Sequence, residues 1–223
     1  MVGKRRRADG VTTRRALVVR GGWEGHLPVE ATELFIPFLR ENDFEVVVSD
    51  TTESYLDLDG TDLVLQCVTM SEIPGEHLKG LEAAIRKGTG LAGWHGGIVD
   101  SFRNSADYSF ITGGQFISHP HGYIDYRVDI VADHPIVEGM THFDVHTEQY
   151  YVHADPTNNV LATTTFRSHP DYPWIEGATM PAVWTRTWGA GRVFVCTVGH
   201  KLVDLDVPEV RTIIERGLLW ASK

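Results

Sequence analysis

Cysteine and long apolar runs are scarce in this chain of 223 residues. The only two cysteines, Cys67 and Cys196, lie in apolar, β-rich runs, so we expect buried reduced thiols rather than a disulfide framework or a metal pair. No apolar run approaches the roughly 18 to 20 residues that a membrane-spanning helix needs. The basic N-terminus also lacks the apolar run of a secretory signal. These absences predict a soluble, cytoplasmic protein with no membrane partner.

Positive charge is scarce outside the first fifteen residues. Residues 1–15 hold six Lys or Arg and one Asp, although the chain as a whole carries a net charge of −10. The rest of the chain is therefore acidic, which argues against a nucleic-acid partner because such binding begins with the neutralisation of phosphates. We expect residues 1–15 to form a basic, flexible leader and residues 16–223 to form a single globular domain.

Phosphate-binding motifs are also missing. The glycine-rich segment Gly21-Gly-Trp-Glu-Gly-His26 has neither the spacing of a dinucleotide loop nor the terminal Lys-Ser or Lys-Thr of a P-loop. Glu24 in this segment would repel phosphate. No loop rich in Ser and Thr follows the first predicted strand, as a flavodoxin-like flavin carrier would require. We therefore expect neither a nucleotide nor a flavin cofactor.

The chain does contain alternating strand and helix patterns. Apolar runs predict strands at 16–20, 44–48, 62–67 and 90–93, and helical spacing predicts helices within 29–41, with a kink or break at Pro37, and between Pro74 and Gly88. This order is typical of a parallel sheet with helices on both faces. The fold class is therefore α/β.

The pattern changes after Tyr123. Segments 126–131, 159–164 and 182–185 are β-rich and separated by turn residues, which predicts an antiparallel extension of the sheet. Residues 191–197 predict a last buried strand, and a closing helix around 210–218 is expected to be capped by Asp206 and Glu209.

Three predicted strand ends each carry a histidine. His26 follows the first strand, His95 the fourth and His200 the last. Ligands of an open α/β sheet bind outside the carboxyl ends of its strands, so these side chains are expected to converge. His200 follows Gly199, which lets the chain turn, and its imidazole can then act as a base or a metal ligand.

His95 occupies an unusual position. The segment Gly93-Trp-His-Gly-Gly97 suits a tight strand-to-helix turn that presents its middle side chain. Such a turn normally presents a Ser or Cys nucleophile, so His95 is a general base, a metal ligand or the sign of a lost nucleophile. Trp94 beside it either contacts substrate or belongs to the core.

Two further segments carry titratable groups. His119 and His121 lie in a predicted loop, where they share a metal, line the rim of a cleft or simply lie on the surface. If 146–153 is extended, His146, Glu148 and Tyr150 share one face. Exposed aromatic residues within 143–152 suit either a cleft or the contact of a homo-oligomer.

Several ordered motifs resemble the ThuA-like, trehalose-utilisation family over residues 17–220. They are Gly21-Gly-Trp-Glu-Gly-His26, Gly90-Leu-Ala-Gly-Trp-His-Gly-Gly97, Gly113-Gly-Gln-Phe-Ile-Ser-His-Pro120, Asp133-His-Pro-Ile-Val-Glu-Gly139, Glu148-Gln-Tyr150, Gly189-Ala-Gly-Arg-Val-Phe194 and Gly199-His200. The resemblance implies a three-layer, flavodoxin-like fold similar to the class I glutamine amidotransferase domain. It does not imply amidotransferase activity, because His95 replaces the nucleophilic Cys of that domain.

The resemblance also implies a role in carbohydrate catabolism, beside oxidoreductases that make 3-keto derivatives of disaccharides and glycosides. A ketone acidifies the proton on the neighbouring carbon, so a base and an electrophile could drive elimination, isomerisation or bond cleavage. We expect a lyase, isomerase or hydrolase acting on a small carbohydrate, with catalytic residues His95, Glu148 and His200. The alternative is a non-catalytic sugar-binding or sensing module.

The expected ligand contacts complete the prediction. Flat aromatic rings stack on sugar faces, and Trp23, Trp94, Tyr150 and Trp184 are candidates for that role. The residues expected to bind substrate are Gly22, Trp23, Glu24, His26, Trp94, His119 and Tyr150. A divalent metal such as Zn is expected to be held by some or all of His26, His95, Glu148 and His200.

Overall fold

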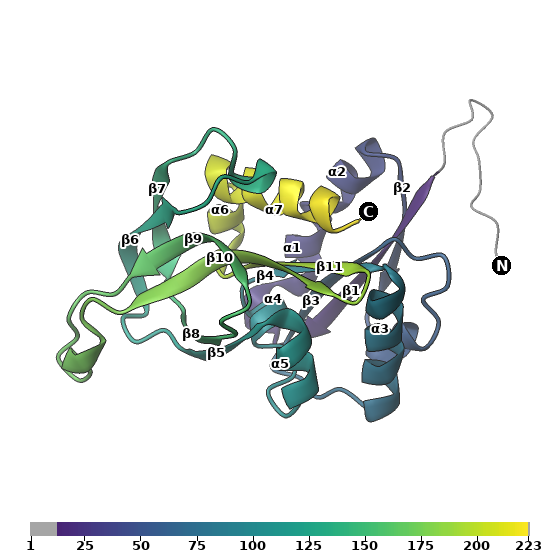
Figure 1. The fold of residues 1–223 in the computed structure, drawn as a ribbon, viewed down its shortest axis with the longest axis horizontal. Helices are drawn as coiled ribbons and strands as arrows, with labels where there is room; N and C mark the ends of the chain where they lie inside the picture. The colour runs from purple at the N-terminus through teal and green to yellow at the C-terminus, as the bar shows by residue number, and fades with distance from the viewer. Residues whose placement is uncertain (1–12, 223) are drawn as a thin grey trace.

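A nine-stranded mixed sheet forms the centre of the molecule in the computed structural model, which describes residues 13–222 (Figure 1). The strand order is β2-β1-β3-β4-β11-β10-β9-β6-β7. The pairs from β2 to β11 are parallel, and the pairs from β11 to β7 are antiparallel. The strands of this sheet are β1 (Arg14–Gly22), β2 (Phe44–Ser49), β3 (Leu63–Thr69), β4 (Gly90–Trp94), β6 (Tyr123–Ile130), β7 (His142–Glu148), β9 (Asn159–Thr165), β10 (Thr179–Trp188) and β11 (Gly191–Cys196).

Helices cover both faces of the parallel part, and a small second sheet lies beside it (Figure 1). The second sheet pairs β5 (Gly114–Ser118) with β8 (Tyr151–Ala154). The helices are α1 (Pro28–Glu33), α2 (Ile36–Glu41), α3 (Gly75–Lys87), α4 (Gly96–Val99), α5 (Ala106–Thr112), α6 (Leu202–Leu205) and α7 (Pro208–Ala221), with short 3-10 turns η1 (Glu24–His26), η2 (Thr52–Leu56), η3 (Pro135–Val137) and η4 (Pro173–Ile175).

Two apolar cores lie on opposite faces of the sheet because strand side chains alternate in direction. Ala16 and Val18 of β1 belong to the core that contains side chains of α1, α2 and α7. Leu17 and Val19, the intervening residues, belong to the core that contains side chains of α3, α4 and α5. The α/β class, the parallel sheet and its antiparallel extension are therefore confirmed.

The helical segment within 29–41 is divided, as the proline predicted. α1 ends at Glu33 and α2 begins at Ile36, so the break precedes Pro37 rather than falling on it. Pro37 occupies the first turn of α2, where its missing N–H is tolerated because that group has no partner within a helix.

The predicted caps of the closing helix are wrong. Val207 is the N-cap residue of α7 and makes no side-chain capping hydrogen bond, and Pro208 begins the helix. Asp206 instead ends α6, and its Oδ1 accepts a hydrogen bond from Arg211 Nη2 at 2.6 Å.

The boundary of the N-terminal leader also differs from the prediction. β1 begins at Arg14, which pairs with Phe44 of β2, and Arg14 Nη1 donates a hydrogen bond to Ser222 Oγ at 3.0 Å. Arg14 and Arg15 thus belong to the folded domain. Residues 1–12 of the predicted leader lie outside the described residues.

Two expectations about burial have different outcomes. Cys67 and Cys196 are free and buried, as predicted. The aromatic residues expected to be exposed within 143–152 are not, because Phe143 and Tyr150 are buried and Tyr151 is half-buried. This segment therefore supplies no exposed aromatic surface for a contact between copies of the chain.

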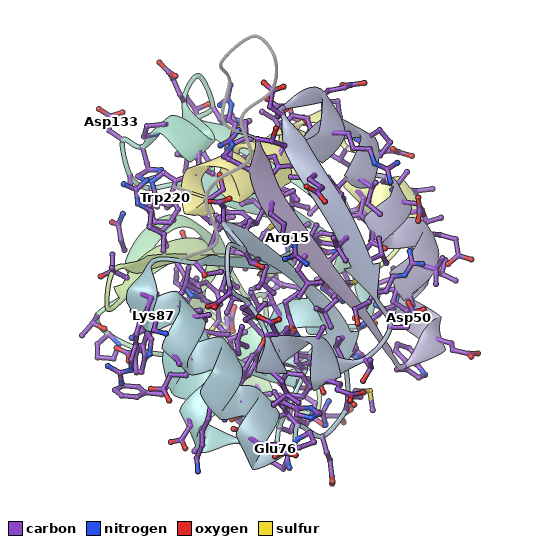
Figure 2. The ribbon with its side chains drawn as sticks, turned by 90° about the vertical axis from the view of Figure 1, so that its right-hand side faces the viewer. Arg15, Asp50, Glu76, Lys87, Asp133 and Trp220 are labelled. Carbon is purple, nitrogen blue, oxygen red and sulfur yellow. The ribbon has the colours of Figure 1, made fainter. Side chains whose placement is uncertain are left out.

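The parallel strands place their carboxyl ends along one edge of the sheet. Arg15 lies near the start of β1 and Asp50 just after the end of β2, and Figure 2 labels both on this strand pair. The loops that follow β1, β3, β4 and β11 all begin at the edge marked by Asp50. Among the described residues, no helix is long and apolar enough to cross a membrane.

Candidate metal centre and active site

Four side chains from distant parts of the chain meet at the carboxyl edge of the sheet. His26 comes from η1, His95 from the turn between β4 and α4, Glu148 from the end of β7, and His200 from the loop after β11. One donor atom of each residue lies within 4.8 Å of the donor atoms of the other three. The predicted convergence of the three histidines is therefore confirmed, and Glu148 lies beside them.

The turn at His95 has the strained geometry of a nucleophile elbow. His95 has φ 49° and ψ −142°, a conformation that costs free energy for a residue with a Cβ. Its backbone N–H donates to Cys196 O at 2.6 Å, which ties the turn to β11. Gly96 follows, and a Cβ at that position would clash with the His26 ring. Only glycine therefore lets the elbow and the His26 ring approach each other this closely.

Neighbouring groups fix the orientation of the His95 ring. Its Nδ1 donates a hydrogen bond to Thr197 O at 2.8 Å, because a carbonyl oxygen can only accept. The proton is thus held on Nδ1, and the lone pair of Nε2 faces the cluster. The ring also stacks on Tyr150, with 4.0 Å between ring centroids.

The loop after β1 carries His26 across the end of β3. Gly22 has φ +79°, and a Cβ there would clash with the Thr69 backbone, so this close crossing requires glycine. Trp23 N–H donates to Thr69 O at 3.0 Å. Thr69 Oγ1 lies 2.9 Å from His26 Nδ1, and His26 Nε2 lies 3.1 Å from His200 Nδ1.

Glu148 supplies the negative charge of the cluster. It is only 7% exposed, and its Oε2 lies 2.9 Å from His200 Nδ1 and 3.3 Å from His95 Nε2. Its other oxygen, Oε1, lies 3.6 Å from Nε2 of His119, whose side chain is partly exposed.

Burial and close neighbours set the protonation of the cluster. Burial lowers the pKa of His95, and burial together with the nearby His95 and His200 lowers the pKa of His26 to about 3. Burial alone would raise the pKa of Glu148, but its contacts with His200 and His95 outweigh burial and hold the pKa well below its ordinary value. At neutral pH, His26 and His95 are therefore neutral and Glu148 is ionised, which are the forms that bind a cation.

The donor set and its spacing fit a divalent metal. Three imidazole nitrogens and a carboxylate oxygen are typical ligands of Zn and of similar transition metals. A tetrahedral centre with bonds of about 2.1 Å separates its ligand atoms by about 3.4 Å. The measured separations around His200 Nδ1 are 2.9 Å to Glu148, 3.1 Å to His26 and 3.2 Å to His95. His26, His95, Glu148 and His200 could thus hold one metal ion.

Some residues predicted to bind substrate border the cluster. Trp23 is 47% exposed, and its ring centroid lies 4.8 Å from that of His26. His119 lies beside Glu148, whereas Glu24 is exposed on the same loop as Trp23. Gly22 contributes through its backbone, as described above. Trp23 and His119 are partly exposed and lie next to the cluster, so their side chains are the best placed of these to contact a ligand.

Three aromatic candidates for sugar stacking have other roles. Trp94 is 3% exposed and packs against Phe35, so its placement in the core does not agree with a substrate contact. Trp184 is fully buried, and its Nε1 donates to Thr112 O at 2.9 Å. Tyr150 is also buried, and it supports the ring of His95.

The structure does not bring His121 and His146 into the cluster. His121 Nε2 donates to Arg167 O at 3.2 Å, and His146 Nδ1 lies 3.0 Å from Asp125 Oδ1 on the surface. Both line a pocket of about 400 Å³, which Tyr123 also lines. The option that His119 and His121 share a metal is therefore not supported by their positions.

Sequence reasoning missed three residues that adjoin the cluster. Thr69 and Thr197 orient His26 and His95, and both lie at the ends of predicted strands, where a search for hydrogen-bonding groups could have found them. Tyr123 has its ring centroid 5.3 Å from that of His200. Burial, with the nearby Glu148 and Asp204, raises the pKa of Tyr123 to about 12. Only the pairing of β6 with β7 places Tyr123 opposite Glu148.

Comparison with known proteins agrees with the fold. Two solved ThuA-like proteins are similar to this chain. The one from Parabacteroides merdae has a TM-score of 0.76 and 17% identity, with 95% of this chain and 90% of that chain covered. The one from Bacteroides uniformis has a TM-score of 0.75 and 15% identity, with 93% and 91% covered. A search of curated proteins found no match.

A part of a larger enzyme has a related fold. The β-galactosidase from Bacillus circulans sp. alkalophilus aligns with a TM-score of 0.58 and 13% identity, with 93% of this chain but only 30% of the galactosidase covered. At these identities the likenesses concern the fold alone. The family comparison is more specific, since residues 15–221 match the family described as ThuA, trehalose utilisation. The chain therefore belongs to the ThuA trehalose-utilisation family.

Proposed function

We propose that this protein is an enzyme of carbohydrate catabolism that moves a proton on the carbon next to a carbonyl group of a sugar derivative. The observation that carries the proposal is the cluster of His26, His95, Glu148 and His200, whose donor atoms lie within 4.8 Å of one another. Membership of a family linked to trehalose utilisation supports a carbohydrate substrate. The occurrence of a related fold within β-galactosidases is in keeping with this substrate class.

The cluster contains the groups that such a reaction needs. Glu148 is ionised and is not far from His119, whose Nε2 lies 3.6 Å from Glu148 Oε1, so a proton that the carboxylate takes from the substrate can pass toward His119. His119 stands beside Glu148 Oε1 and is partly exposed, which gives the proton a route to solvent. The strained elbow and the Thr197 carbonyl hold His95 in place before the substrate arrives.

His26, His95 and His200 would hold a metal that supplies Lewis-acid polarisation of the substrate carbonyl, and these three ligands leave a position open for the substrate and leave Glu148 free to take the proton. The chain itself supplies the surface for the sugar. The partly exposed ring of Trp23 lies next to His26, and an aromatic face of this kind stacks on the apolar face of a pyranose.

Deuterium exchange tests the proposal without requiring the final product to be known. The probe is methyl 3-keto-α-D-glucopyranoside in D₂O, because elimination and isomerisation both begin with loss of the proton next to the ketone. We expect the metal-loaded wild type to catalyse exchange at C2, observed by NMR, and Glu148→Gln to lower the rate by about 100-fold or more.

His142→Ala is the matched control for this experiment. His142 lies on β7, the same strand as Glu148, but it is exposed, and its Nδ1 lies 3.3 Å from Thr141 Oγ1. The control should exchange at the wild-type rate. Wild-type protein that binds the probe but leaves its C2 proton in place would instead identify a sugar-binding module, the alternative favoured by the histidine at the elbow.

We also propose that the protein works in the cytoplasm, where small sugar derivatives are processed. The two buried cysteines support this location because both remain free, as in a reducing compartment.

A further inference from the structure

The hydroxyl of Tyr123 is buried and has no hydrogen-bond partner among the described residues. Most buried polar atoms in proteins are paired, so an unpaired hydroxyl requires a specific explanation. Tyr123 lies at the start of β6, directly opposite Glu148 of β7 in the antiparallel pair. The unpaired hydroxyl therefore belongs to a residue at the candidate active site.

A second unpaired atom belongs to a residue beside the same carboxylate. His119 Nδ1 is also buried without a partner, while Nε2 of the same ring lies 3.6 Å from Glu148 Oε1. Two residues next to Glu148 thus each keep one polar atom without a protein partner. Such a pair indicates that a polar ligand, rather than another part of the described chain, completes the hydrogen bonding here.

The Tyr123 ring is held firmly. Its centroid lies 5.3 Å from that of His200, with the rings at 89°, and Lys201 Nζ lies 3.9 Å from the ring centroid on its face. The backbone of Lys201 is held in place, since its N–H donates to Asp204 Oδ2 at 2.8 Å. These contacts restrain the ring, and with it the hydroxyl, before a ligand binds.

We propose that the Tyr123 hydroxyl donates a hydrogen bond to the substrate oxygen that gains negative charge when the neighbouring C–H proton leaves. This inference rests on the proposed function and names a catalytic residue that the sequence motifs did not include. A phenol is protonated at neutral pH and can donate. The hydrogen bond strengthens as the oxygen becomes negative, so it favours the transition state over the ground state.

The variant Tyr123→Phe removes the hydroxyl and keeps the ring. With methyl 3-keto-α-D-glucopyranoside as the probe, we expect kcat for C2 deuterium exchange to fall by at least about tenfold while KM changes much less. Metal content should match the wild type because Tyr123 is not one of the four candidate ligands. The Tm should stay the same or rise, because the variant loses a buried polar atom that has no partner.

Tyr126→Phe provides the matched comparison for stability. Tyr126 lies on the same strand, but its buried hydroxyl donates to Glu148 O at 3.2 Å. Its removal leaves that carbonyl without the bond, so this variant should have a lower Tm than the wild type. A hydroxyl that merely supports the fold would make the two variants behave alike.

Two results would overturn the role of Tyr123 alone. One is exchange by Tyr123→Phe within twofold of the wild type, and the other is a fall in Tm equal to that of Tyr126→Phe. A wild type that neither exchanges the probe nor binds it in calorimetry would overturn the proposed function, and the role of Tyr123 with it. The two failures are therefore distinguishable.

Discussion

At the scale of single residues, the candidate ligands depend on oxygen atoms that the motifs do not contain. Thr197 O holds the proton on His95 Nδ1, and Thr69 Oγ1 lies 2.9 Å from His26 Nδ1. Outer hydrogen bonds of this kind orient metal-binding histidines and tune their basicity. The geometry of the cluster is therefore built by backbone and hydroxyl oxygens at the ends of β3 and β11.

Thr69→Val tests this second layer. The substitution removes the hydroxyl next to His26 while keeping a similar volume, so we expect the affinity for Zn²⁺ to fall by about 10- to 100-fold. Competition with a chromophoric chelator measures the change. Thr165→Val, at an exposed position on β9, is the control and should bind as the wild type does. Equal affinity of the Thr69 variant would show that this hydroxyl does not orient His26.

Trp23 and Trp94 were both predicted to bind substrate, but their replacement by alanine should have different effects on stability and on sugar binding. Trp94→Ala should lower the free energy of unfolding by about 3–5 kcal/mol, because Trp94 is buried against Phe35. Trp23→Ala should change stability much less, since Trp23 is 47% exposed, but should weaken sugar binding. Urea denaturation and calorimetry with the keto-glycoside probe measure the two effects. The reverse pattern would restore Trp94 to the binding site.

The residues of the site were predictable to different degrees. His26, His95 and His200 each follow a strand with a recognisable apolar pattern, so the rule that ligands bind at strand ends was enough to group them. Trp94 could not be assigned, because periodicity does not tell which side chain of a tight turn points into the core. Tyr123 carries no local signal, because its role depends on the register between β6 and β7.

At the scale of elements, the elbow between β4 and α4 packs directly against the loop that carries His26. Gly96, the first residue of α4, lies where a Cβ would clash with the His26 ring and approach Thr69 Cγ2. One added methyl group should therefore disturb the metal centre without changing any ligand.

Gly96→Ala tests this packing. We expect a loss of about 1–3 kcal/mol in the free energy of unfolding, typical of overpacking, together with weaker Zn²⁺ binding. Gly75→Ala is a close control, because Gly75 is also the first residue of a helix but has no atom within 4 Å of an added Cβ. Thermal unfolding with and without Zn²⁺ measures both effects. If the two variants behave alike, the elbow is not packed against His26 as described.

Most elements were predictable because local chemistry and tertiary packing agree. Pro74 and Gly88 bracket α3 as expected, and the apolar runs of the central strands β3 and β4 are buried on both faces. The caps of α7 could not be predicted, because Asp206 ends α6 and accepts a hydrogen bond from Arg211 instead of capping α7. A short helix immediately before the closing helix left no sequence pattern strong enough to separate the two.

At the scale of the whole molecule, the cluster joins the parallel half of the sheet to its antiparallel extension. His26, His95 and His200 belong to the parallel half, whereas Glu148 ends β7 at the far edge strand of the sheet. Sequence spacing could not predict that Glu148 meets the three histidines. This contact depends on the strand order β9-β6-β7, which places the end of β7 at the site. The carboxylate of the cluster thus comes from the extension.

Acidification should destabilise the metal-free protein. The folded state holds the pKa of His26 near 3, whereas the unfolded chain binds this proton at about pH 6.5, so the unfolded state gains protons first as the pH falls. The lowered pKa of Glu148 acts in the same direction through the range below about pH 4.5. Stability conferred by these groups is thus present at neutral pH and lost on the acid side.

Urea denaturation with a chelator present measures this effect. The urea concentration at the midpoint of unfolding should be lower at pH 5 than at pH 7. His26→Gln should make this difference smaller, because glutamine does not titrate. A midpoint that stays constant or rises on acidification would contradict the electrostatic description of the cluster.

The central claim is that His26, His95, Glu148 and His200 form one metal centre, and elemental analysis tests it most directly. Wild type, His95→Ala and the surface control His142→Ala are loaded with Zn²⁺, freed of excess metal and analysed together. The account predicts about one equivalent per chain in the wild type and the control, and little or none in His95→Ala. Absence of bound metal from the wild type, or equal content in all three proteins, would contradict it.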